Sequence, residues 1–282
     1  MNGISSIGFI GAGSMAEAMV AGLVEKKQLR KQNIYVTNHS NDARLNYFKS
    51  TYGVNVTRDK QEIVTNCDLI VLAMKPKDVV EGVQSIKPFI KDKQFIVSVL
   101  AGVSTESIQT LIEKEVAVVR AMPNTSASIG LSATAIAKGE FATTYHIKES
   151  KQLFSSIGTV TIVKEDDLHA VTGLSGSGPA YVYYLVEAME AAAHTIGLNQ
   201  ETAKDLILQT LIGSAEMLKH SSKSPATLRK EVTSPGGTTE AGLKTLSAYR
   251  YQEAMIECIK QATERSKELG ESINQTTMSP KL

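Results

Sequence analysis

The stretch that decides the fold reads Ile7-Gly8-Phe9-Ile10-Gly11-Ala12-Gly13-Ser14-Met15-Ala16. A short apolar strand pattern runs into a glycine turn, and a helix pattern follows at once. In such a turn the first glycine permits the tight bend, the second lets the backbone approach a pyrophosphate, and Ala16 allows the helix to pack on the strand. At the start of alternating strands and helices, this pattern favours a dinucleotide-binding turn over a glycine turn without a ligand.

Strand and helix patterns alternate from Ser6 to about Val163. The expected strands are Ile4–Ile10, Ile34–Thr37, Leu69–Ala73, Phe95–Val99 and Val116–Arg120. The expected helices between them are Ser14–Lys26, Asp42–Ser50, Lys77–Ile86 and Thr105–Ile112. Two further extended runs, Ser132–Ala137 and Gly158–Val163, flank a helix at His146–Ser156 and are expected to complete the sheet edge. Strict alternation predicts an α/β fold with an N-terminal Rossmann-like, doubly wound parallel sheet.

The sequence changes character after Val163. From Gly178 onward only long helical patterns remain, and they cover Pro179–Ile196, Glu201–His220 and Thr238–Leu269. We therefore predict a dinucleotide-binding domain over residues 1–163 and an all-helical domain over residues 164–282. The apolar positions of the last helix exceed what so small a domain can bury, so we expect a second subunit to complete it.

Composition excludes several classes of protein. The 282 residues carry a net charge of +1 and no tryptophan, so nucleic-acid binding is not expected. No apolar run reaches the span of a bilayer and no leader pattern precedes the first strand, so we expect a cytoplasmic protein without membrane contact. Cys67 and Cys258 form no metal-binding pattern, so we predict no metal site and expect both thiols to be buried.

The end of the second expected strand indicates which dinucleotide the turn takes. Folds that prefer NAD place Asp or Glu there to accept a hydrogen bond from the ribose 2′-hydroxyl. This chain instead has Thr37-Asn38-His39-Ser40, with Arg44 one helical turn further on. Donors without a carboxylate suit a 2′-phosphate, so we predict NADPH as the cofactor, with NADH as the alternative.

Later strand ends fall on the same edge of the predicted sheet, where open α/β sheets bind ligands. They are Ala73-Met74-Lys75-Pro76 and Val99-Leu100-Ala101-Gly102. Lys75 has a competing interpretation as a solvated loop charge. The predicted cofactor-binding residues are Gly8, Gly11, Ala12, Gly13, Ser14, Met15, Asn38, Ser40, Arg44, Ala73, Met74, Lys75, Pro76 and Ala101.

A second motif, Ser234-Pro235-Gly236-Gly237-Thr238-Thr239, precedes the apolar helix pattern of Ala241, Leu243 and Leu246. A Pro-Gly-Gly turn at a helix start leaves backbone N–H groups free, and together with the helix dipole these bind a carboxylate or phosphate. The competing interpretation is a capped helix after a tight turn.

Two blocks closely resemble the signature of pyrroline-5-carboxylate reductases. One is Leu174-Ser175-Gly176-Ser177-Gly178-Pro179-Ala180-Tyr181. The other keeps the family spacing at Pro225, Leu228, Val232, Thr233, Ser234, Gly236, Gly237, Thr239, Gly242, Leu243 and Leu246. One position departs, because Ser247 stands where the family usually has an acidic residue, an amide or lysine.

The resemblance implies NADPH-dependent reduction of the cyclic imine 1-pyrroline-5-carboxylate to L-proline, the last step of proline biosynthesis. It also implies a helical domain that binds substrate and forms a homodimer, or a higher homo-oligomer of dimers. The implied substrate-binding residues are Ser234, Gly236, Gly237, Thr238, Thr239 and Asn124. Thr239 would bond the ring nitrogen through its hydroxyl, and Glu165 would stabilise the iminium charge, although a run of acids at a domain boundary is also explained by solvation.

The chemistry agrees with an imine. No lysine lies between Val171 and Thr202, where related dehydrogenases place a catalytic one. Reducing C=O benefits greatly from a general acid, whereas a protonated C=N carries its own activation, so orientation can supply most of the rate. A 3-hydroxyacid-type dehydrogenase and a dinucleotide-sensing regulatory protein remain the alternatives.

Overall fold

The computed structural model describes residues 3–278, with side chains as far as residue 272. The chain forms two compact units, which we call the sheet unit (residues 1–177 and 260–282) and the helical unit (residues 178–259). These limits differ from the predicted boundary at 163/164, because residues 164–177 and the second half of the last helix pack with the sheet. The division of the chain at 163/164 into a dinucleotide-binding domain and a substrate-binding domain stays a prediction.

The sheet unit is built on eight strands in the order β3-β2-β1-β4-β5-β6-β7-β8. They are β1 (Ile7–Ile10), β2 (Ile34–Thr37), β3 (Asn55–Val56), β4 (Leu69–Leu72), β5 (Phe95–Ser98), β6 (Ala117–Met122), β7 (Ser132–Lys138) and β8 (Gly158–Ile162). The strands β1 to β6 are parallel, which confirms the parallel sheet predicted for the five of them other than β3. β7 instead runs antiparallel to β6, and β8 parallel to β7. The connection over residues 123–131 is too short for the crossover that a parallel pair needs.

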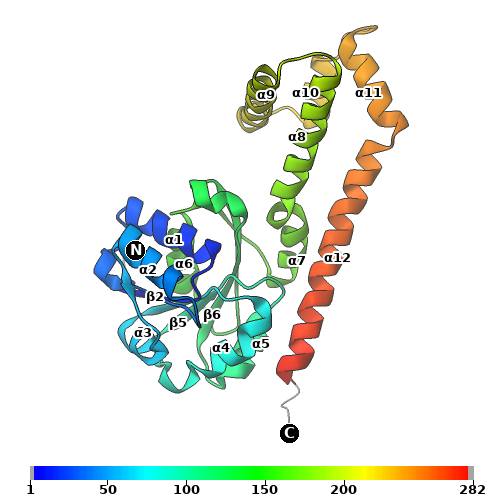
Figure 1. Cartoon of the computed structure of the whole chain (residues 1–282). Helices are drawn as coiled ribbons and strands as arrows, with labels where there is room; N and C mark the ends of the chain where they lie inside the picture. The colour runs from blue at the N-terminus through cyan, green and yellow to red at the C-terminus, as the bar shows by residue number, and fades with distance from the viewer. Residues whose placement is uncertain (1–2, 279–282) are drawn as a thin grey trace. The chain divides into compact units, whose positions relative to one another are not determined.

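Helices cover both faces of this sheet (Figure 1). One core cluster joins the sheet to α1 (Ser14–Glu25), α2 (Asp42–Tyr52) and α6 (Thr144–Phe154). The other joins it to α3 (Lys60–Asn66), α4 (Val79–Gln84) and α5 (Thr105–Ile112). Strands buried on both faces read as continuous apolar runs, and the fully buried β1 and β4 have that pattern.

One strand and two α-helices of the sheet unit were not predicted: β3, α3 and the four-residue α7 (Leu168–Val171). β3 has only two residues, and α3 has seven, so neither is long enough to show a period. The signal for α3 was Asp59, whose side chain accepts hydrogen bonds from the N–H groups of Gln61 and Glu62 and caps the helix.

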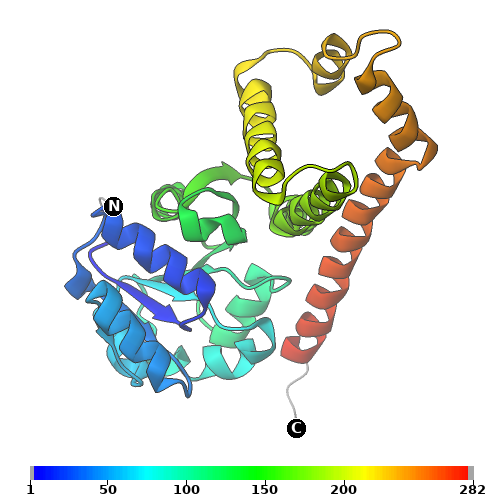
Figure 2. The same ribbon diagram turned by 45° about the horizontal axis from the view of Figure 1, so that its top comes forward.

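The helical unit holds α8 (Gly178–Thr195), α9 (Gln200–His220), α10 (Pro225–Glu231), α11 (Thr238–Ala248) and the start of α12 (Tyr251–Met278). α8 and α9 pack together around Ala193, Ala203 and Ile207 (Figure 2). The single helix predicted over Thr238–Leu269 is wrong, because the chain breaks at Arg250, whose φ of 54° is left-handed. α10 was also not predicted.

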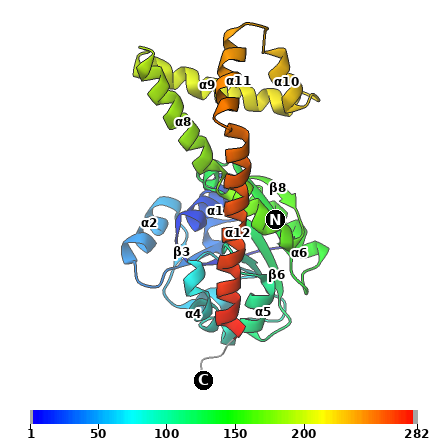
Figure 3. The same cartoon turned by 90° about the vertical axis from the view of Figure 1, so that its right-hand side faces the viewer.

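The second half of α12 belongs to the sheet unit (Figure 3). Ser266 on this half is buried and its hydroxyl lies 3.0 Å from His169 Nδ1. The backbones of Gly102 and Gly270 approach closely, since a Cβ added at Gly102 would lie 3.1 Å from Gly270 N. The helix is therefore fixed to the sheet unit by polar and backbone contacts.

Two observations concern thiols and membranes. Cys67 is buried as expected, whereas Cys258 is exposed on α12, which corrects the expectation that both are buried. Over residues 3–278, no helix is both long and apolar enough to cross a bilayer.

Candidate functional site

The glycine turn lies where the strand order reverses, between β1 and β4. Gly11 adopts a φ of +117°, and a Cβ there would lie 2.5 Å from the carbonyl oxygen of Ala73. Its N–H donates to Thr37 O at 3.1 Å, while Ala73 N–H donates to Ile10 O at 2.9 Å. Only glycine fits this position, because both the left-handed φ and the close approach exclude a side chain.

A cavity of about 760 Å³ opens next to this turn, large enough for a dinucleotide's adenosine and phosphates. Gly13 contributes to it, and a Cβ there would meet nothing closer than Ala73 O at 3.9 Å. The remaining predicted residues that line it are Gly11, Ala12, Ser14, Met15, Asn38, Ser40, Arg44, Ala73, Met74 and Lys75. The sequence motifs at the ends of β1, β2 and β4 are thus brought to one cavity.

The chemistry of the cavity suits a dinucleotide. Thr37 lines it, is 1% exposed, and has a buried hydroxyl oxygen that finds no hydrogen-bond partner among the described residues. Such a group is costly unless a ligand satisfies it. The open space at Gly13 and the N-terminus of α1 suit a pyrophosphate. The residues present therefore fit the predicted cofactor.

The loop after β2 is organised by Asn38. Its Oδ1 accepts hydrogen bonds from the N–H groups of Ser40 and Asn41, each at 3.0 Å. Asn41, not Asp42, caps α2, because its side chain accepts from Arg44 N–H. Asp42 pairs with Arg58 instead. Residues 38–41, which follow β2, therefore supply no carboxylate, in agreement with the sequence argument for a 2′-phosphate.

Three predicted cofactor residues lie outside the cavity lining: Gly8, Pro76 and Ala101. For Gly8 packing explains the glycine, because a Cβ would lie 2.3 Å from Ile63 Cγ2. Lys75 lines the cavity and is exposed, so its role in binding the cofactor stays a prediction.

The second motif forms a tight turn at the start of α11. Gly237 N–H donates to Ser234 O at 3.0 Å, and Gly236 has a φ of +71°. Gly236 N–H donates to the Glu240 carboxylate at 2.8 Å, so two of the expected free amides are used inside the loop. Among the described residues, the N–H groups of Thr238 and Thr239 have no acceptor, and both side chains are exposed.

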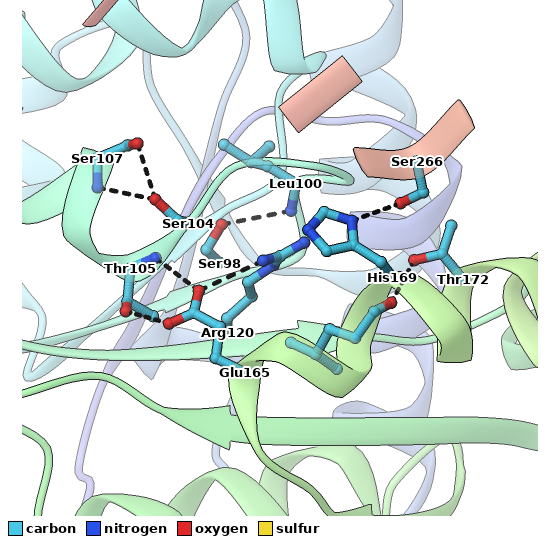
Figure 4. Close-up of polar contacts among 11 residues, drawn as sticks. Ser98, Leu100, Ser104, Thr105, Ser107, Arg120, Glu165, His169, Thr172 and Ser266 are labelled. Carbon is cyan, nitrogen blue, oxygen red and sulfur yellow. Dashed lines mark hydrogen bonds and ion pairs between the residues drawn. The ribbon is translucent and has the colours of Figure 1, made fainter. Parts of the chain in front are cut away.

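Glu165 has partners for both carboxylate oxygens within the sheet unit (Figure 4). Thr105 donates its N–H to Oε1 at 2.8 Å and its hydroxyl to Oε2 at 2.5 Å. Arg120 Nη1 lies 3.3 Å from Oε1 and is 4% exposed. Sequence reasoning missed both partners, because they follow from the pairing of distant strands and not from any local pattern.

His169 extends this cluster toward α12 (Figure 4). Burial first, and then the charge of Arg120, hold the pKa of His169 below its usual 6.5. The ring is therefore neutral near pH 7 and bonded to Ser266.

Asn124 follows β6 and uses both ends of its amide. Its Nδ2 donates to Ser175 O at 3.1 Å, and its Oδ1 accepts from Ser126 N–H at 3.2 Å. Asn124 therefore joins the strand end to the block that contains Gly176. Across the described residues, no group of three or more His, Cys, Asp or Glu could hold a metal ion.

Two family models match the chain. Residues 165–269 match the model for pyrroline-5-carboxylate reductase dimerisation. Residues 6–102 match a model described as NADP oxidoreductase, coenzyme F420-dependent. The chain therefore carries a dimerisation region characteristic of a homo-oligomer.

The relatives are similar over almost their whole length. Pyrroline-5-carboxylate reductase 2 of Bacillus subtilis (strain 168) is 52% identical over 268 residues, which cover 95% of this chain and 96% of the relative. A pyrroline-5-carboxylate reductase structure from Coxiella burnetii has a TM-score of 0.86 and 37% identity, and the match covers 94% and 98% of the two chains. The Plasmodium falciparum pyrroline carboxylate reductase with NADP bound has a TM-score of 0.87 and 29% identity, over 96% and 99%. The chain belongs to the pyrroline-5-carboxylate reductase family.

Proposed function

We propose that the loop Ser234–Thr239 binds the imine substrate and that the cavity beside Gly11 and Gly13 binds the cofactor. The chain is an NADPH-using oxidoreductase that reduces 1-pyrroline-5-carboxylate to L-proline, the last step of proline biosynthesis. The observation that carries the substrate proposal is the pair of N–H groups at the start of α11 for which the described part of the chain offers no acceptor.

The N–H groups of Thr238 and Thr239 hold the substrate carboxylate in this proposal. They stand at the positive end of an 11-residue helix, which stabilises an anion. The same turn already binds a carboxylate of the chain, because Gly236 N–H donates to Glu240. Ser234, Gly236 and Gly237 shape the turn, which leaves the next two amides free.

Thr239 orients the ring nitrogen through its hydroxyl, whereas Thr238 contributes its backbone N–H. A protonated imine needs no further proton from the protein, and hydride addition to its carbon leaves a neutral amine. Bound NADPH supplies that hydride. The protein's contribution is then orientation, which accounts for a large part of the rate in reactions of two bound groups. Asn124 is proposed to line the site beside the reacting groups.

Glu165 is proposed to act by its charge and position, not by proton transfer. Three hydrogen bonds from Thr105 and Arg120 hold both carboxylate oxygens in place. Because Arg120 offsets part of that charge, its proposed stabilisation of the iminium is weak. The larger proposed contribution is to hold the loop after β5, which contains Ala101.

We also propose a cytoplasmic homodimer, with a higher homo-oligomer of dimers as the extension. Large apolar side chains on the helical unit support this, since Tyr184 is 76% and Ile212 57% exposed in the single chain.

The test is cofactor oxidation, followed by absorbance, after addition of 1-pyrroline-5-carboxylate to the purified chain. We expect oxidation of NADPH with formation of proline, and a higher kcat/KM with NADPH than with NADH. Oxidation of 3-hydroxyacids in place of imine reduction would contradict the proposed chemistry, and a clear NADH preference would contradict the cofactor assignment.

A further inference from the structure

Glu17, in the first turn of α1, collects three side-chain donors from α2. Tyr47 and Tyr52 donate their hydroxyls to Oε1 at 3.0 and 3.1 Å. Arg44 donates from Nη2 to Oε2. Burial raises the pKa of Glu17, but the hydrogen bonds from these three residues outweigh it and hold the pKa below its usual 4.5. The carboxylate is thus a fixed negative charge.

Arg44 is positioned equally firmly. Its Nε donates to the carbonyl oxygen of Ala12, in the glycine turn, at 2.7 Å. Its Cζ lies 5.0 Å from the Phe48 ring centre and 5.2 Å from that of Tyr47. Nε and Nη2 are therefore occupied, while Nη1 has no partner among the described residues. The guanidinium lines the cofactor cavity with its charge offset by Glu17.

Two other basic side chains of the cavity, Lys60 and His39, are less well placed to replace Arg44. Lys60 Nζ donates to Ser85 Oγ at 2.8 Å. His39 lies 3.5 Å from the carboxylate of Glu81, with both side chains more than three-quarters exposed. Arg58 is also held near the end of β2, by Asp42 and the carbonyl oxygen of His39, but it does not line the cavity. Among the basic residues that line the cavity near this strand end, Arg44 is thus the one whose geometry is fixed, and Glu17 is the group that modifies its charge.

We propose that Glu17 is a determinant of cofactor selectivity: it offsets the charge of Arg44 beside the 2′-phosphate subsite and so limits the preference for NADPH over NADH. The inference rests on the proposed cofactor site. A 2′-phosphate brings close to two negative charges, which Glu17 repels and Arg44 attracts. NADH has a hydroxyl there, so the charge of Glu17 matters little to it.

The test substitutes Glu17→Gln, which keeps the side chain's length and an acceptor oxygen while it removes the charge. Dissociation constants of NADPH and NADH are measured by cofactor fluorescence in the substrate-free protein over a series of salt concentrations. We expect NADPH to bind about fivefold more tightly, NADH to change less than about twofold, and NADPH binding to become more sensitive to salt.

Two controls separate charge from shape. Tyr52→Phe removes one hydrogen bond to Glu17 and no charge, so the ratio of the two dissociation constants should stay within about twofold of wild type. Arg44→Gln should weaken NADPH, and in its presence Glu17→Gln should lose most of its selective effect, as a double-mutant cycle reports.

The outcomes are distinct. If Glu17→Gln weakens NADPH, or alters both cofactors equally, Glu17 merely supports the local structure and the inference is overturned. If Glu17→Gln binds NADPH but leaves the ratio of the NADPH and NADH dissociation constants unchanged, the inference is overturned and the proposed cofactor site stands. Failure of the wild-type protein to bind NADPH overturns both.

Discussion

The two units of the chain differ in how much of their apolar surface they bury alone. The sheet unit has two large core clusters, and its central strands β1, β4 and β5 are entirely buried. The helical unit has one small cluster of three buried residues, while Tyr184, Ile212 and Tyr249 are 76%, 57% and 83% exposed. A unit with its own core is complete as one chain, whereas the helical unit has the composition of an interface.

The largest effect is expected when charged residues are placed on the exposed apolar face of α9, which tests whether the helical unit needs a second subunit. Leu208 and Ile212 lie four residues apart on one face. In the double variant Leu208→Lys/Ile212→Lys, two unpaired charges would be buried in the proposed interface. We expect the dissociation constant of the oligomer to rise at least about a hundredfold, which light scattering would detect.

The control places a lysine on the sheet unit. Asn46→Lys, on the exposed side of α2, should leave the oligomer intact. NADPH binding should survive in the α9 variant, because the cofactor cavity is made entirely by the sheet unit. An α9 variant that stays oligomeric would contradict the assignment of this face to the interface.

The second prediction contrasts two glycines of the same turn. At Gly13 a side chain would enter the cavity without a clash, so Gly13→Val should weaken NADPH at least about a hundredfold and change unfolding free energy by less than about 0.5 kcal/mol. At Gly11 the clash with Ala73 and the positive φ make Gly11→Ala destabilising by about 2–4 kcal/mol.

Cofactor fluorescence and urea unfolding measure the two effects separately. If a folded Gly13→Val protein bound NADPH with wild-type affinity, the cavity would not be the cofactor site. An unaltered stability of Gly11→Ala would contradict the close approach of β1 and β4.

Most of the sheet could be predicted from the sequence, because its central strands are apolar throughout. Apolar runs such as Ile7–Ile10 and Leu69–Leu72 are buried on both faces, so each strand carries its own signal. The short β3 carries none, and the reversal at β7 depends on connection length. The break at Arg250 was missed because an arginine with positive φ has no local signature.

The candidate site was predictable where it depends on backbone and missed where it depends on distant side chains. Gly11, Gly13 and the Ser234–Thr239 turn follow from glycine and helix-start chemistry. The partners of Arg44 and Glu165 do not, because Glu17 and Arg120 come from other elements that only the fold brings near.

The third prediction tests the helical unit's contribution to chemistry. Thr239→Val keeps the side chain's shape and removes the hydroxyl. If Thr239 orients the imine nitrogen, kcat/KM should fall about ten- to a hundredfold, since one polar contact to a charged group is worth about 1.5–3 kcal/mol. NADPH affinity should stay nearly unchanged, because the cavity is lined by the sheet unit alone.

Thr238→Val is the control, with a smaller expected effect because the proposed contribution of Thr238 is its N–H. Both variants require a thermal melt, since the two residues open α11. If Thr238→Val loses activity and Thr239→Val does not, the two assignments are reversed. If neither changes activity, the substrate site lies elsewhere.

The smallest expected effect is on stability, and it is measured by the same change, Glu to Gln, made once in each unit. The folded-state pKa of Glu17 lies below its ordinary 4.5, so its stabilising contribution is fully present above that pH and is lost as the pH falls through the folded pKa. Because Glu17 is 26% exposed, Glu17→Gln should lower stability near neutral pH by less than about 1 kcal/mol. The difference from wild type, measured by urea unfolding, should shrink toward zero as the pH falls below 4.5. Glu231 pairs with Lys223 on the exposed surface of α10 in the helical unit, so Glu231→Gln should produce no measurable change near neutral pH. Equal effects of the two substitutions would mean that the donors around Glu17 stabilise it no better than water does.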